Sequence, residues 1–132
     1  MKNEEKLSNR LLREYLEIGF NMGKEIGKQV DVSKVKSLED LDEIIDDTYN
    51  IYMDNLTQSS EYSNFILPEL RKAAGCKDPL GVGTYTECNI DSIETYNENV
   101  DKFDEAIYNG LLWEAAKKYM EKSILKLKRL KQ

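Results

Sequence analysis

The chain has 132 residues and a formal net charge of −6, and 40% of its residues are hydrophobic, so we expect one domain, residues 1–132, with a real core. It contains no histidine, which excludes Ser-His-Asp and Cys-His catalysis, histidine-ligated zinc and a histidine pH switch. The acidic balance argues against direct DNA binding, which needs a basic surface. Because no stretch has the character of a signal peptide or a membrane span, we expect a cytoplasmic protein without membrane contact.

A long first helix is predicted over residues 4–30, where apolar residues recur at steps of three and four. Gly19, Gly23 and Gly27 fall at steps of four and so form one smooth strip, the glycine ridge. A glycine costs about 1 kcal/mol relative to alanine inside a helix, so close packing is expected at this ridge. A crossing with another helix of the same chain, a homodimer or partner groove, and a break near Gly19 all remain open.

A second helix is predicted over residues 38–56. Ser37 and Asp40 have the spacing of a capping box, in which the hydroxyl accepts from a first-turn N–H and the carboxylate reaches back. Six apolar positions make the expected buried stripe: Leu38, Leu41, Ile45, Tyr49, Tyr52 and Leu56.

Beyond this helix, residues 61–75 are typical of one or two short helical pieces, with Pro68 in a first turn and Gly75 as a left-handed stop. Residues 76–90 contain Pro79, Gly81 and Gly83 and are expected to form the one irregular loop. The two cysteines, Cys76 and Cys88, lie in this loop. They are too few to close a zinc site, so no cofactor is expected.

A long last helix is predicted from a cap at Asp91 or Ser92 to the end of the chain, with a possible kink at Asn109-Gly110. Its predicted buried stripe runs from Tyr96 to Leu127 and Leu130. The whole pattern indicates an all-α fold of four to five helices, with long first and last helices.

Charge is unevenly distributed along the chain. Between Lys36 and Arg71 there are nine carboxylates and no basic side chain, whereas residues 114–132 carry seven basic residues and two acids. Cations at the end of a helix interact favourably with its dipole, and the simplest expectation is that they face the acidic block of the same fold. Contact with a membrane or with RNA is the alternative for this basic end.

The candidate site is the polar side of the second helix. Like-charged pairs four residues apart, such as Glu43 and Asp47, each destabilise a helix by about 0.2–0.5 kcal/mol. We therefore expect either a function that requires these acids or a positive charge that compensates them. Carboxylates at this spacing resemble a row of phosphates and suit a basic groove. The candidate partner-binding residues are Glu39, Asp42, Glu43, Asp46, Asp47, Tyr49 and Asp54.

The function expected from the sequence is non-enzymatic protein binding. We expect an inhibitor of the anti-defence, anti-CRISPR-like or immunity type that occupies the basic nucleic-acid-binding groove of another protein. This expectation requires the acids of the second helix to be displayed outside the fold and not neutralised by the basic end of the chain.

Two other functions remain open alongside a merely solvated acidic face. One is a magnesium-dependent nucleotide pyrophosphatase, in which acids of the second helix would converge with acids of the last helix. The candidate ligands there are Glu94, Glu98, Asp101, Asp104 and Glu105. The other is a homodimeric assembly protein that packs through the glycine ridge.

Overall fold

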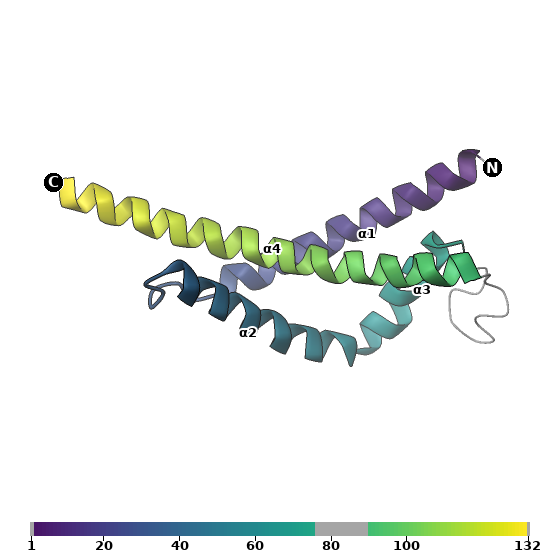
Figure 1. Cartoon of the computed structure of the whole chain (residues 1–132), viewed down its shortest axis with the longest axis horizontal. Helices are drawn as coiled ribbons and strands as arrows, with labels where there is room; N and C mark the ends of the chain where they lie inside the picture. The colour runs from purple at the N-terminus through teal and green to yellow at the C-terminus, as the bar shows by residue number, and fades with distance from the viewer. Residues whose placement is uncertain (1, 76–89, 132) are drawn as a thin grey trace.

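The computed structural model describes residues 2–75 and 90–131, and this part of the chain is helical almost throughout. The elements follow in the order α1 (Lys2–Gln29), α2 (Leu38–Thr57), the π-helical turn η1 (Tyr62–Ile66), α3 (Leu67–Ala73) and α4 (Ile90–Lys131). Figure 1 shows that the second half of α1 crosses α4 near the middle of α4, with α2 lying along one side of the pair. The predicted all-α fold with long first and last helices is confirmed.

The crossing of α1 and α4 is built on backbone contact. A β-carbon placed on Gly23 would lie 1.9 Å from the carbonyl oxygen of Ile107, and one placed on Gly110 would lie 1.9 Å from the carbonyl oxygen of Phe20. The two helices can approach this closely only because both surfaces lack side chains at these positions. The glycine ridge is thus occupied by α4 of the same chain, and a dimer through it would first have to displace α4.

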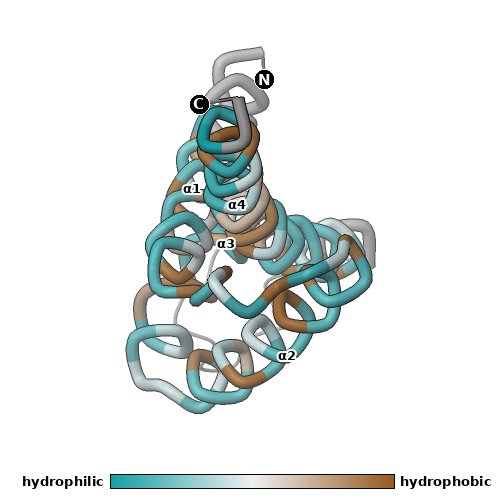
Figure 2. The backbone as a smooth tube through the Cα atoms, turned by 90° about the vertical axis from the view of Figure 1, so that its left-hand side faces the viewer, coloured by the Kyte–Doolittle hydropathy of each residue, from teal (hydrophilic) through white to brown (hydrophobic). Residues whose placement is uncertain are grey.

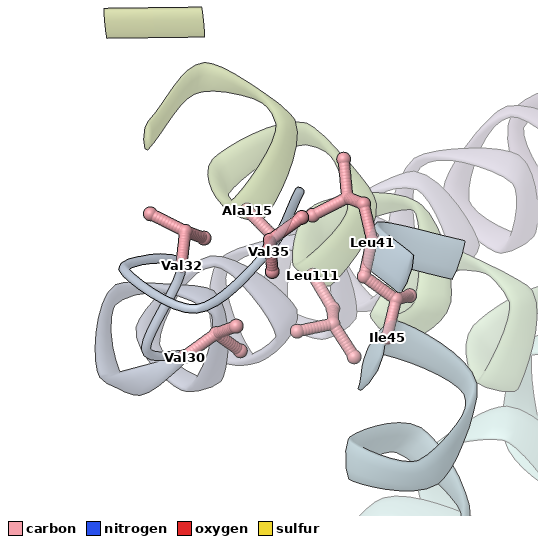
Figure 3. Close-up of a cluster of buried hydrophobic side chains, with 7 residues drawn as sticks. All are labelled: Val30, Val32, Val35, Leu41, Ile45, Leu111 and Ala115. Atoms are coloured by element: carbon pink, nitrogen blue, oxygen red, sulfur yellow. The ribbon is translucent and has the colours of Figure 1, made fainter. Parts of the chain in front are cut away.

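The connection between α1 and α2, residues 30–37, is packed by its valines. The side chains of Val30, Val32 and Val35 are buried together with residues of α2 and α4. Figure 3 shows this cluster, whose other members are Leu41, Ile45, Leu111 and Ala115. It holds the start of α2 against the middle of α4. Figure 2, which looks along the molecule, shows α2 beside the α1–α4 pair and not between them.

A second cluster joins η1 and α3 to α4, with Phe103 and Leu70 fully buried at its centre. The π-helical turn ends two residues before Pro68, which lacks an N–H and cannot make the usual helical bond. The N–H of Leu67 bonds instead to the carbonyl of Tyr62, five residues back. The expected helical pieces over 61–75 and the left-handed Gly75, with φ of 88°, are both confirmed.

Several details differ from expectation. Leu38 and Leu127, predicted in buried stripes, are 68% and 59% exposed, so within the described residues no other element covers either of these two side chains. The last helix begins at Ile90, so neither Asp91 nor Ser92 is its cap. It continues through Gly110 as one helix.

The predicted loop and its two cysteines lie, apart from Ile90, outside the described residues. No helix in the described ranges is long and apolar enough to span a membrane.

Candidate functional site

The start of α2 is fixed by hydrogen bonds close to those its sequence predicts. The Ser37 hydroxyl accepts from the Asp40 N–H at 3.1 Å, and the Asp40 carboxylate accepts from the Lys36 N–H at 3.1 Å. The carboxylate therefore reaches one residue further back than in a standard capping box. These bonds, with Leu41 and Ile45 buried beneath, decide which side of α2 points outward.

The predicted acidic residues of α2 lie on that outward side. Exposed carboxylates extend from the first turn of α2 to its last two turns: Glu39, Asp42, Glu43, Asp46, Asp47 and Asp54. We call these six residues the acidic face. In residues 10–75 and 93–129, the ion pairs join Arg10 to Glu14 and Lys28 to Glu25, and none involves the acidic face.

Up to Arg129, no lysine or arginine of α4 makes an ion pair with the acidic face. The ammonium group of Lys122 donates to the carbonyl oxygens of Val32, Ser33 and Val35 at 2.9–3.1 Å, and Lys118 donates to those of Lys28 and Val30. These carbonyls belong to the end of α1 and to the connection that follows. The expectation that this end of the chain faces the acids was wrong for these two lysines, because the connection passes between them and α2 and supplies acceptors first.

A polar hollow of about 440 Å³ lies where the connection meets α2. Four carboxylates line it: Asp31, Asp40, Glu43 and Asp47. Lys34 is the one cation among the lining residues, and Val35 and Ile44 supply an apolar floor. Hydrogen bonds from Ser33 lower the pKa of Asp31 below its ordinary value, so this carboxylate is ionised at neutral pH. We call this feature the acidic hollow.

Tyr49, which was predicted both in the buried stripe of α2 and as the aromatic member of the partner-binding site, points inward. Its ring is half-buried and meets Tyr108 edge to face at 5.2 Å, and its hydroxyl donates to the backbone carbonyl of Asp104 at 3.3 Å. Tyr108 in turn donates to the carboxylate of Asp46 at 2.9 Å. These contacts tie α2 to α4, so Tyr49 acts as a structural anchor and not as an exposed contact residue.

Asp104 itself lies in an unusual environment for a carboxylate. Burial raises its pKa to about 6, with a further increase from nearby Asp101, while a hydrogen bond from the Tyr62 hydroxyl at 3.3 Å acts in the opposite direction. Burial also raises the pKa of Tyr62 well above its ordinary value. Sequence reasoning named Asp104 only as a possible magnesium ligand and missed its tyrosine partners, because they come from elements more than forty residues away along the chain.

The acids proposed as magnesium ligands do not converge. Asp104 is held by tyrosines, whereas Glu98, Asp101 and Glu105 are exposed on α4. Within the described ranges, no three carboxylate or thiol side chains come close enough together to hold one metal ion.

A groove that the sequence prediction missed lies on the side of α4 that faces away from α2. It has a volume of about 590 Å³, and its walls are apolar: Phe20, Leu112, Trp113, Ala116, Met120 and Ile124. Trp113 and Met120 are 59% and 62% exposed. The signal in the sequence is a second apolar stripe on α4, at steps of three and four, on nearly the opposite side of the helix from the stripe that forms the core. We call this feature the apolar groove.

Comparisons of the chain with protein-family models, with curated proteins and with solved structures gave no match.

Proposed function

We propose that this protein binds a basic surface on another protein through the acidic face and the acidic hollow of α2, and that it acts by occupying a nucleic-acid-binding groove. The observation that carries the proposal is the absence of an ion pair to the acidic face within residues 10–75 and 93–129, although the chain is rich in lysine. A cationic partner stabilises a helix with this charge pattern, because its charge relieves the repulsion between neighbouring carboxylates.

The geometry of the acidic hollow supports an arginine or lysine side chain as the central contact. The aliphatic part of such a side chain fits an apolar floor of the kind that Val35 and Ile44 provide, while its charged group remains among carboxylates. Arginine matches two carboxylates at once and is enriched at the centres of interfaces. The exposed acids further along α2 would then steer the approach of the partner and make its rate of association depend on salt.

The test uses two variants with the same change of charge. One neutralises part of the proposed surface, with Asp42→Asn, Glu43→Gln and Asp47→Asn. The control neutralises three exposed acids of α4, with Glu98→Gln, Asp101→Asn and Glu105→Gln. Asp46 is left intact because it accepts the hydrogen bond from Tyr108 and has a structural role.

Each immobilised variant is exposed to lysate of the source cell, and captured proteins are identified by mass spectrometry. We expect the unmodified chain and the α4 variant to retain a nucleic-acid-binding protein that is released by salt or by added DNA. The α2 variant should lose that protein. Equal capture by both variants, or a partner that DNA does not displace, would overturn the proposal.

A further inference from the structure

The helix α4 carries two apolar stripes on nearly opposite sides, and the fold covers only one of them. Leu111 and Ala115 are fully buried against α2 and the connection. The second stripe, formed by Trp113, Ala116, Met120 and Ile124, lines the apolar groove. A soluble helix normally has one apolar stripe, and a second exposed stripe of this length marks an interaction surface.

The end of α4 also receives little cover from the described part of the chain. Every residue from Ile124 to Arg129 is exposed, including Leu125 at 55% and Leu127 at 59%. Figure 1 shows this end of α4, in yellow, extending beyond α2. A helical end without tertiary packing is only marginally stable in water, so a partner that packs along this stripe would stabilise it.

We propose that a second copy of this chain covers the apolar groove, with the two α4 helices antiparallel and crossing near Met120. The charged residues at the rim indicate this occupant. Lys117 and Glu121 are opposite in sign, four residues apart and on the same edge of the groove. A twofold axis near residue 119 places Lys117 of each copy opposite Glu121 of the other, which makes two equivalent ion pairs.

The same arrangement matches the apolar residues. With the twofold axis at this position, Trp113 of each copy lies beside Ile124 of the other, and the two Met120 side chains meet near the centre. Aromatic and methionine side chains are enriched at the centres of interfaces, with charged residues at the rim, as here. This interface uses the side of α4 away from the acidic face, so it is independent of the proposed function.

The first test measures the oligomeric state of the full chain by sedimentation over a range of concentrations. We expect a dimer that dissociates on dilution, and a monomer for the double variant Met120→Glu, Ile124→Glu. The matched control, Leu38→Glu with Ile51→Glu, changes two comparably exposed residues of α2 and should remain dimeric. Circular dichroism of each variant shows whether the helices are retained.

The second test addresses the antiparallel register. Lys117→Glu and Glu121→Lys, made separately, each place like charges opposite one another. Each should raise the dissociation constant of the dimer roughly tenfold. The double variant exchanges the two charges and should restore it.

The proposal would be overturned if the unmodified chain stays monomeric at every concentration. It would also be overturned if the variant with both Lys117→Glu and Glu121→Lys forms a dimer no more stable than those of the two single variants. In the monomeric case the groove would be assigned to a different protein.

Discussion

The carbonyl oxygen of Ile107 lies 1.9 Å from the position that a β-carbon on Gly23 would occupy. Carbonyl and helix backbone cannot move aside as a flexible side chain can, so Gly23→Ala forces α1 and α4 apart. We expect this variant to lose about 3 kcal/mol or more of the free energy of unfolding, measured by urea denaturation.

Gly19→Ala is the matched comparison. Its β-carbon would meet the ring and carbonyl of Phe103 at 3.1 Å, a contact that a small shift relieves. Because alanine also favours the helix by about 1 kcal/mol, this variant should stay within about 1 kcal/mol of the unmodified chain. Equal losses at the two positions would contradict the backbone contact described for Gly23.

A second prediction concerns Lys122, whose ammonium group donates to three carbonyls of the connection between α1 and α2. Lys122→Met retains the aliphatic part of the side chain and leaves those carbonyls without this donor. The expected loss is about 1.5–3 kcal/mol in the free energy of unfolding. Lys128→Met removes an exposed charge from the same helix and should change stability by less than about 0.5 kcal/mol.

The raised pKa of Asp104 gives a pH dependence with a definite sign. Between the ordinary pKa of 3.8 and the folded-state value of about 6, the folded protein retains a proton that the unfolded chain has released. The contribution of Asp104 to stability is therefore greatest below about pH 4, decreases as the pH rises to about 6, and stays low above that.

Asp104→Asn should abolish this dependence, because the amide does not ionise, while its carbonyl can still accept from Tyr62. We expect the variant to be more stable than the unmodified chain at pH 7 and to lose that advantage at pH 4. Urea midpoints measured across this range give the comparison. An unchanged profile in Asp104→Asn would contradict the burial of Asp104.

We expect the carboxylates of the acidic face to favour partner binding while lowering the stability of the free protein. Glu43 lies four residues from Glu39 and Asp47 and three residues from Asp40 and Asp46, so Glu43→Gln relieves repulsion with four acidic neighbours. We expect a gain of about 0.4–1 kcal/mol in the free energy of unfolding at low salt, which decreases as salt is added.

Asp54 has no acid three or four residues away, so Asp54→Asn serves as the control and should show no such gain. A loss of stability in Glu43→Gln would mean that Glu43 has a favourable partner.

Sequence reasoning was most successful where structure depends on neighbouring residues. Ser37 and Asp40 marked the start of α2, and Gly75 marked the end of α3, because caps and left-handed stops are local. Periodicity shows which residues share a side of a helix but not whether another element covers that side. Leu127 was therefore misplaced in the core, and Trp113 was not recognised as part of a groove.

The environment of the candidate site could not be read from the sequence for a related reason. The path of residues 30–35 decides which acceptors lie near the lysines of α4. Only the folded chain shows that Lys122 donates to backbone carbonyls of this connection and not to an acid of α2. The position of Tyr49 against Asp104 likewise depends on how α2 and α4 are placed relative to one another.

The backbone contact at the crossing also sets how this chain can vary in length. One residue inserted between Gly19 and Gly23 turns the rest of α1 by about 100°, so that only one part of the ridge can face α4. An alanine inserted after Met22 should therefore abolish the cooperative melting of the helices in circular dichroism, while one inserted after Lys126 should leave it intact. Insertions and deletions are tolerable near the exposed end of α4, whereas the turns around Gly23 and Gly110 have a fixed number of residues.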